Sequence, residues 1–165
     1  MSRFTDVLLV SPLADGRTWV VSRDFGYEVG EEGKGDIVNV ALGFETDFAS
    51  IPRVFWIVLP KWGRYGNASV IHDWLYWIQS RSRREADDIF LEAMGILNVR
   101  ALKKRLIYWA VRGFGWIAWI RNTADREAGY ERVRKYEELR ATAESGRTGT
   151  LKRLTSHAVR KMTRK

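Results

Sequence analysis

Two short stretches of this chain hold side chains that could move protons. His72 and Asp73 are neighbours, Tyr76 follows after one helical turn, and a second acidic pair, Asp87 and Asp88, lies further along. Histidine exchanges a proton near neutral pH more readily than any other side chain. A histidine oriented by a carboxylate can accept a proton from water, so these residue types are typical of a site that activates water for hydrolysis.

Helical geometry sets how these side chains could meet. His72 and Tyr76 are four residues apart and share one helix face, whereas Asp73 lies about 100° away. A short turn at 80–84 predicts an antiparallel second helix, which brings Asp87 or Asp88 level with His72. The second-helix acid would then fix the imidazole tautomer, and Asp73 would bind a hard cation such as calcium. The structural alternative is a core histidine bonded to Asp87 or to the upstream Asp47.

Further polar residues gather at a predicted strand-to-loop junction upstream. Thr46, Asp47 and Ser50 stand close together in the sequence. Asp47 is a candidate metal ligand or acid near the histidine, and Ser50 a candidate hydrogen-bond donor. Alternatively, both cap the following turn. Arg53 would form an ion pair with Asp47 or Asp73, or meet a substrate phosphate.

The elements that must position this site follow from the apolar pattern. Short runs of β-branched and aromatic residues, separated by turn signals such as Asp15-Gly16, predict antiparallel strands over 6–48. From 68 the period becomes helical and predicts a three-helix unit over 68–121. The predicted fold class is therefore α+β, an N-terminal antiparallel β-meander packed on a three-helix unit that contains the helical hairpin.

The second and third helices have distinct signatures. Ser82 and Glu85 form a capping box that starts the second helix. The third, over about 101–121, is strongly apolar but interrupted by arginines, so it falls short of the ~20 residues that a bilayer span needs. It is either a buried helix or a helix lying at a membrane interface, the latter supported by its tryptophans, Trp109, Trp116 and Trp119.

Charge divides the chain unevenly. The net charge is +8, and the segment from Ser145 to the last residue contains seven cations but no acid. We therefore predict a globular domain over 1–121, a charged amphipathic helix over 122–143 and a basic flexible tail over 144–165. Such a tail would suit an anionic polymer such as nucleic acid, an anionic lipid surface or a protein partner.

Composition excludes several classes of protein. The chain has no cysteine, so it has no disulfide framework, thiolate metal site or cysteine nucleophile. Hydrophobic residues make up 45% of the sequence, which is enough for a folded core. The N-terminus has no signal-peptide pattern. We expect the protein in a cytoplasm, and a virion protein would look the same.

The helical hairpin resembles phospholipase A2. The resemblance rests on His-Asp-x-x-Tyr at 72–76 followed by Ala-Asp-x-x-Phe at 86–90, about 25 residues in all. It implies that His72 is the general base, Asp73 a calcium ligand, Asp87 the orienting acid and Tyr76 a support. The segment 60–66 does not reproduce the glycine-rich calcium loop of that family.

A second resemblance covers about residues 18–120. The segments that carry it are 43–53, with Gly-Phe-Glu-Thr-Asp-Phe-Ala-Ser-Ile-Pro-Arg, then 62–65, 72–76 and 84–94. Together they are similar to domain-of-unknown-function family 1353, found in tailed bacteriophages and prophages. The resemblance implies a phage origin and no established activity. With it we expect the protein in the host bacterial cytoplasm or in the phage virion, with phage structural proteins as partners of the tail.

These patterns leave three hypotheses for function. The first is a phage-encoded, metal-assisted hydrolase with a site like that of phospholipase A2. The second is a non-enzymatic virion or tail-assembly component whose basic tail binds a partner or nucleic acid. The third is a protein that acts at a membrane interface through the segment 106–120.

Overall fold

Short strands in the N-terminal third form two small antiparallel sheets. The structure is a computed structural model that describes residues 2–47 and 65–135. The first sheet has the order β1-β4-β5 and the second the order β2-β3-β6. The strands are β1 (Arg3–Phe4), β2 (Val10–Pro12), β3 (Trp19–Val21), β4 (Phe25–Glu28), β5 (Ile37–Val40) and β6 (Glu45–Thr46).

The α+β class is confirmed, but the strands do not form one meander. Only β2–β3 and β4–β5 are neighbours in both sequence and sheet. The predicted turn at Gly16 joins β2 to β3, and its positive φ of 65° suits glycine. The apolar run from Val7 predicted an earlier strand, whereas Val7 is 67% exposed and pairing starts at Val10. Pro12 fits there because β2 pairs only with β3, at a sheet edge.

Three helices follow the strands. They are α1 (Gly66–Ile78), α2 (Arg83–Ile96) and α3 (Ala101–Glu127). The predicted capping box of α2 is confirmed, since the Ser82 side chain accepts from the Glu85 backbone and Glu85 reciprocates. A left-handed Gln79, with φ of 52°, ends α1 just before it. The short turn between these two caps fixes α1 against α2.

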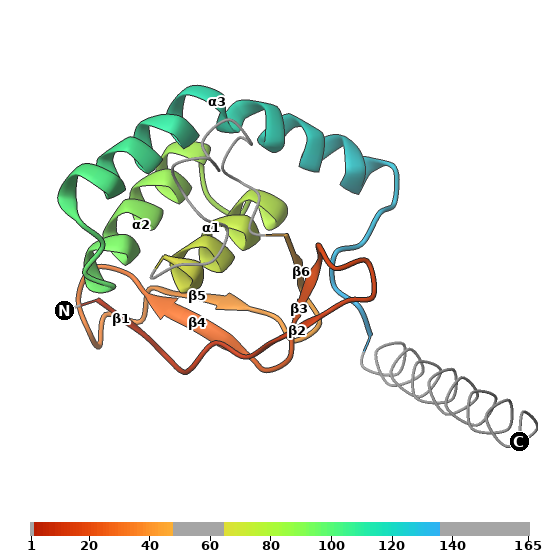
Figure 1. Ribbon diagram of the computed structural model, residues 1–165, viewed down its shortest axis with the longest axis horizontal. Helices are drawn as coiled ribbons and strands as arrows, with labels where there is room; N and C mark the ends of the chain where they lie inside the picture. Colours follow the sequence, from red (N-terminus) through yellow and green to blue (C-terminus); the bar gives the residue numbers. More distant parts are fainter. Residues whose placement is uncertain (1, 48–64, 136–165) are drawn as a thin grey trace, which may run out of the picture. The chain divides into compact units, whose positions relative to one another are not determined.

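Helix α1 is the centre of the domain. It contacts β5 and β6 on one side and α2 and α3 on the other, and Figure 1 shows the helices gathered on one side of the β4–β5 sheet. Ile71, Leu75 and Tyr76 of α1 are almost fully buried in the core. Polar links also join the layers, because Tyr27 in β4 donates a 2.9 Å hydrogen bond to Glu92 in α2. Side chains on α1 are therefore held from several directions.

The third helix is longer than the sequence predicted. Residues 122–127 continue α3 instead of starting a separate charged helix over 122–143, and residues 128–135 are not helical. Asn122 explains the continuation, since its buried amide donates 3.0 Å to the Tyr76 carbonyl. Gly129, with φ of 83°, follows the end of α3, and Val133 then pairs with Phe44. The tail predicted over 144–165 lies outside the described residues.

Within the described residues, no helix combines the length and the apolar character required to cross a bilayer. The 27-residue α3 comes nearest in length, but charged side chains recur along it.

Candidate active site

The predicted meeting of His72 with an acid of the second helix takes place. His72 Nε2 lies 2.8 Å from Asp87 Oδ1, and both side chains are completely buried. Of the two acids that the sequence left open, Asp87 is therefore the partner. Asp88 faces outward, where it accepts a 2.7 Å hydrogen bond from Tyr108.

Asp87 receives hydrogen bonds on both carboxylate oxygens. Oδ1 accepts from Tyr76 Oη at 2.6 Å as well as from His72. Oδ2 accepts from Arg112 Nη1 at 2.7 Å and from Arg83 Nη1 at 3.4 Å. Four donors match the acceptor capacity of an ionised carboxylate. Tyr76 thus has the supporting position that the sequence predicted, and the two arginines compensate the buried charge.

Burial and neighbouring charges set the protonation of this pair. Burial lowers the pKa of His72 below its usual 6.5; the bond to Asp87 opposes this effect, and the charge of Arg83 adds to it. Burial alone would raise the pKa of Asp87, but the hydrogen bonds from His72, Tyr76 and Arg112 hold it below its usual value. At neutral pH the pair is therefore a neutral imidazole beside an ionised carboxylate. Nε2 must then carry the proton that it donates to Asp87.

The other ring nitrogen is left as a buried base. His72 Nδ1 is buried and has no hydrogen-bond partner among the described residues. Its ring is held between two aromatic rings, with centroids 4.1 Å from Tyr76 and 4.6 Å from Phe90. A buried polar atom without a partner is rare in folded proteins. Its lone pair can accept a proton from water or from a substrate, which is what a general base does.

Asp73, a predicted metal ligand, bonds to a residue of β6, whereas His72 bonds to α2. Asp73 is buried, and its Oδ2 accepts a 2.6 Å hydrogen bond from Thr46 Oγ1, which links α1 to β6. Asp47 is only partly buried. Calcium prefers six to eight oxygen ligands. Within residues 2–47 and 65–135 no three acidic or histidine side chains stand close enough to hold a metal ion. Calcium binding stays a prediction, and Ser50 and Arg53 lie outside the described residues.

Comparison with known proteins agrees with the second sequence resemblance. A family model described as "Protein of unknown function (DUF1353)" matches residues 19–111. The chain belongs to this family. The matched region includes His72, Tyr76, Arg83 and Asp87, and it stops one residue before Arg112.

One curated relative matches part of this DUF1353 chain. The uncharacterized protein y4jT of Sinorhizobium fredii is 34% identical over 97 residues, which are 58% of this chain. The aligned part is only 28% of that relative, so the chain spans less than a third of its length. No solved structure matches this member of the DUF1353 family.

Sequence reasoning missed several residues of the site. Arg83 was predicted to belong to a solvated turn, although its spacing of four from Asp87 on one helix was a usable signal. Arg112 was read only as an interruption of an apolar helix. Phe90 was assigned to the core, and it also stacks on His72 at an interplanar angle of 24°. The contact of Arg112 depends on how α3 packs, which no local pattern reports.

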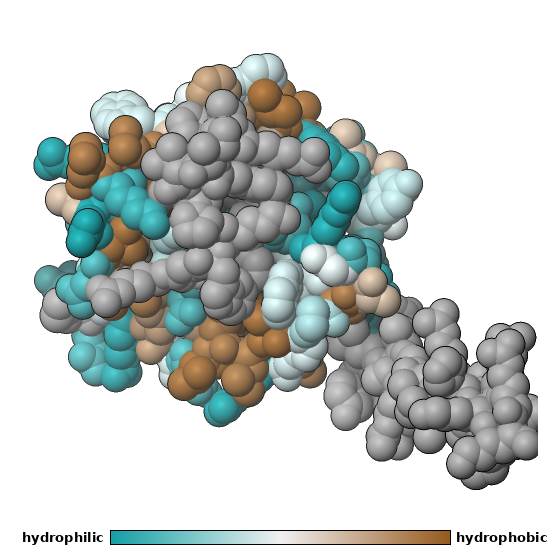
Figure 2. Space-filling model, viewed as in Figure 1, coloured by the Kyte–Doolittle hydropathy of each residue, from teal (hydrophilic) through white to brown (hydrophobic). Residues whose placement is uncertain are grey.

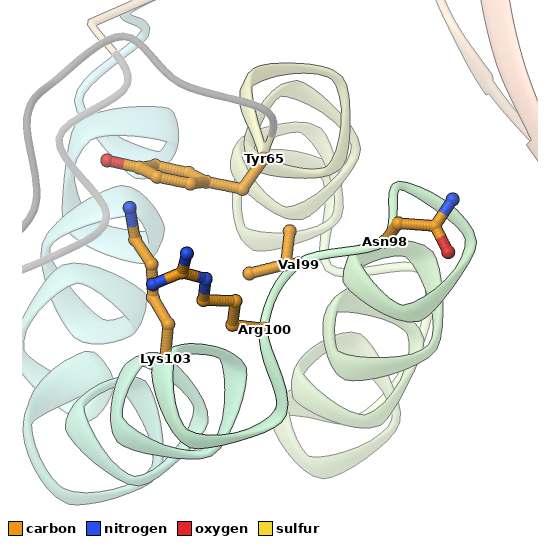
Figure 3. Close-up of a pocket in the computed structure, with 5 residues that line it drawn as sticks. All are labelled: Tyr65, Asn98, Val99, Arg100 and Lys103. Atoms are coloured by element: carbon orange, nitrogen blue, oxygen red, sulfur yellow. The ribbon is translucent and has the colours of Figure 1, made fainter.

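A cavity lies apart from this network. It has a volume of about 380 Å³ and is lined by Tyr65, Asn98, Val99, Arg100 and Lys103. Figure 3 shows Arg100 and Lys103 extending toward the Tyr65 side of the cavity. Lys103 Nζ lies 4.9 Å from the centre of the Tyr65 ring. None of the side chains that contact Asp87 lines it, so the cavity is not a route to His72 through described residues.

The lowered pKa of His72 predicts that acid destabilises the protein. Unfolded histidine titrates near 6.5, whereas the folded imidazole stays neutral to lower pH, so the unfolded state binds more protons below 6.5. This contribution to stability is complete above pH 6.5 and decreases by up to about 1.4 kcal/mol per pH unit as pH falls toward the folded pKa. Urea unfolding at pH 7.5, 6.5 and 5.5 measures it.

The matched variant for this measurement is His72→Gln, which keeps every other titrating group, including His157. Its free energy of unfolding should depend less steeply on pH over the same window. Equal slopes for the wild type and His72→Gln would show that His72 is not held neutral by the fold.

Proposed function

We propose that this protein is a hydrolase in which His72 activates water through Nδ1. The observation that carries the proposal is the buried Nδ1 without a hydrogen-bond partner among the described residues, on a ring whose Nε2 lies 2.8 Å from Asp87. In such a pair the carboxylate fixes the tautomer and stabilises the imidazolium that forms when the base accepts a proton. The resemblance of the hairpin to phospholipase A2 supports a carboxylic or phospholipid ester as substrate.

The surrounding residues have positioning roles in this proposal. Asp87 orients His72, and Tyr76, Arg83 and Arg112 hold Asp87 ionised. Since the His72 ring is fully buried, the reaction requires a movement that admits water and substrate to Nδ1. No step of the proposal uses a metal ion, and the test below includes calcium because the sequence predicts Asp73 as its ligand.

Fatty-acid release from phosphatidylglycerol vesicles tests the proposal, with calcium and with a chelator in parallel. We expect release by the wild type and a decrease of at least about 100-fold in His72→Asn, the range for loss of a general base. His157→Asn, the same substitution at the chain's other histidine, should keep full activity. Release that needs calcium would support Asp73 as a ligand, whereas equal release with the chelator would remove calcium from the mechanism.

Two further measurements keep this test decisive. Circular dichroism of His72→Asn must show a folded protein, and nitrogen NMR of the wild type should show His72 protonated at Nε2 only. A folded His72→Asn protein with unchanged release, or a wild type that releases nothing, would reject the hydrolase.

Complete burial of His72 favours a second candidate, a non-enzymatic role in which the network only locks the helices together. This reading retains the prediction of a phage virion or tail-assembly component that binds a partner or nucleic acid through its basic tail. A wild type that is inactive on esters but assembles with phage structural proteins, and loses assembly without residues 144–165, would support it.

A further inference from the structure

Helix α3 exposes an apolar face that the domain does not use. Six large apolar side chains, which we call the outer stripe, are each at least half exposed: Leu102, Leu106, Trp109, Trp116, Ile117 and Ile120. Most are three or four residues apart; Trp116 and Ile117 are adjacent, and Gly113 takes the place between Trp109 and Trp116. At 100° per residue all six lie on one side of a helix. In Figure 2 apolar residues in brown lie at the surface along the upper edge of the view, where α3 runs in Figure 1.

The opposite face of α3 already anchors the helix. Ile107, Ala110, Val111 and Gly115 are buried, and α3 packs against both α1 and α2. The outer stripe is therefore not needed to hold the helix in place. Contiguous exposed apolar surface of this kind is uncommon on a protein without a partner and usually marks a site of interaction.

Charge identifies the kind of partner. From Ala101 to Arg121 the helix has five cations and no acid. At 100° per residue, Arg105 lies along one edge of the outer stripe, and Lys103 and Arg121 along the other. Arg121 keeps a side-chain exposure of 78%, although its Nε lies 3.7 Å from the Asp125 carboxylate. An apolar stripe with tryptophans and cationic edges is the pattern of helices that lie in a membrane interface, where the cations meet anionic headgroups.

The same charges disfavour a second copy as the partner. A two-fold dimer places the same patch of each subunit against the other. Because Arg105, Lys103 and Arg121 lie at the edges of the outer stripe and no acid lies between Ala101 and Arg121, such pairing would bring like charges together. An anionic lipid surface instead complements both the apolar centre and the cationic edges.

We propose that the outer stripe of α3 docks this protein on anionic membranes, with the helix lying along the bilayer surface. The tryptophans would sit at the boundary between headgroups and acyl chains, the depth that indole rings prefer. The inference goes beyond the proposed hydrolase and does not depend on it, since binding is measured without any ester cleavage.

The test is sedimentation of the full chain with vesicles of phosphatidylglycerol and phosphatidylcholine. We expect Ile117→Glu to bind roughly tenfold more weakly than the wild type, because it removes buried apolar area and adds a repelled charge. The matched control is Val7→Glu, which puts the same side chain at another exposed apolar position, 67% exposed, away from α3. The control should bind like the wild type.

A second readout separates the outer stripe from the basic tail, which could attract the same vesicles. No tryptophan follows Trp119 in the sequence, so quenching of tryptophan fluorescence by brominated acyl chains reports the folded domain. Quenching should occur in the wild type and decrease severalfold when Trp109 and Trp116 are both replaced by Phe. Equal vesicle binding by Ile117→Glu and Val7→Glu, absence of quenching, or a dimer that Ile117→Glu dissociates without lipid would each overturn the proposal.

Discussion

Replacing Asp87 by alanine should destabilise the protein by about 3–5 kcal/mol, the usual cost of removing one partner from a buried ion pair. The carboxylate is completely buried and accepts from His72, Tyr76, Arg83 and Arg112. Without it, four donors lose this acceptor, and the two arginines lose the carboxylate that compensates their charge. Urea unfolding monitored by circular dichroism measures the change.

The neighbouring acid provides the matched control. Asp88 is on the same helix and also meets a tyrosine and an arginine, but it is exposed. Its replacement by alanine should change the free energy of unfolding by no more than about 1 kcal/mol. If Asp87→Ala and Asp88→Ala have similar effects, the Asp87 network does not hold the helices together.

The pairing of His72 with Asp87 could be predicted because it depends on local rules. Helical spacing placed His72 and Tyr76 on one face, and the capping box at Ser82 fixed where the second helix begins. Those two facts limit the acid opposite His72 to Asp87 or Asp88. Which of the two faces His72 depends on how α2 is rotated about its own axis. Burial of the helix face that includes Phe90 and Met94 sets this rotation.

The residues contributed by α3 could not be predicted in the same way. Arg112 lies 25 positions from Asp87, and its role depends on the angle at which α3 crosses the hairpin. The same holds for the strands, since pairing of β1 with β4 is a long-range contact without a turn signal. The contact between Thr46 of β6 and Asp73 of α1 is also long-range, because it crosses the sheet–helix interface.

Gly115 shows most clearly how α3 and the site depend on each other. A Cβ at this position would collide with the Tyr76 hydroxyl and lie 3.2 and 3.3 Å from two atoms of the Tyr76 ring. The hydroxyl cannot move aside freely, because it donates a 2.6 Å hydrogen bond to Asp87. The glycine therefore lets α3 approach α1 closely enough for Arg112 to reach the same carboxylate.

Gly115→Ala should consequently destabilise the protein by about 1–3 kcal/mol, as overpacking of a core does, despite the higher helix propensity of alanine. Gly113, in the same helix, is exposed and has no atom within 4 Å of a built Cβ, so Gly113→Ala should be neutral or stabilise by up to about 1 kcal/mol. Thermal and urea unfolding of the two variants measure the difference.

A double-mutant cycle then tests the cause. Tyr76→Phe removes the hydroxyl that the new methyl group meets, so it should cost less stability in the Gly115→Ala background than in the wild type. Additive effects would show that Gly115→Ala acts elsewhere. Coupling of the expected sign would establish that a backbone position on α3 controls the hydrogen bond to Asp87, and through Asp87 the orientation of His72.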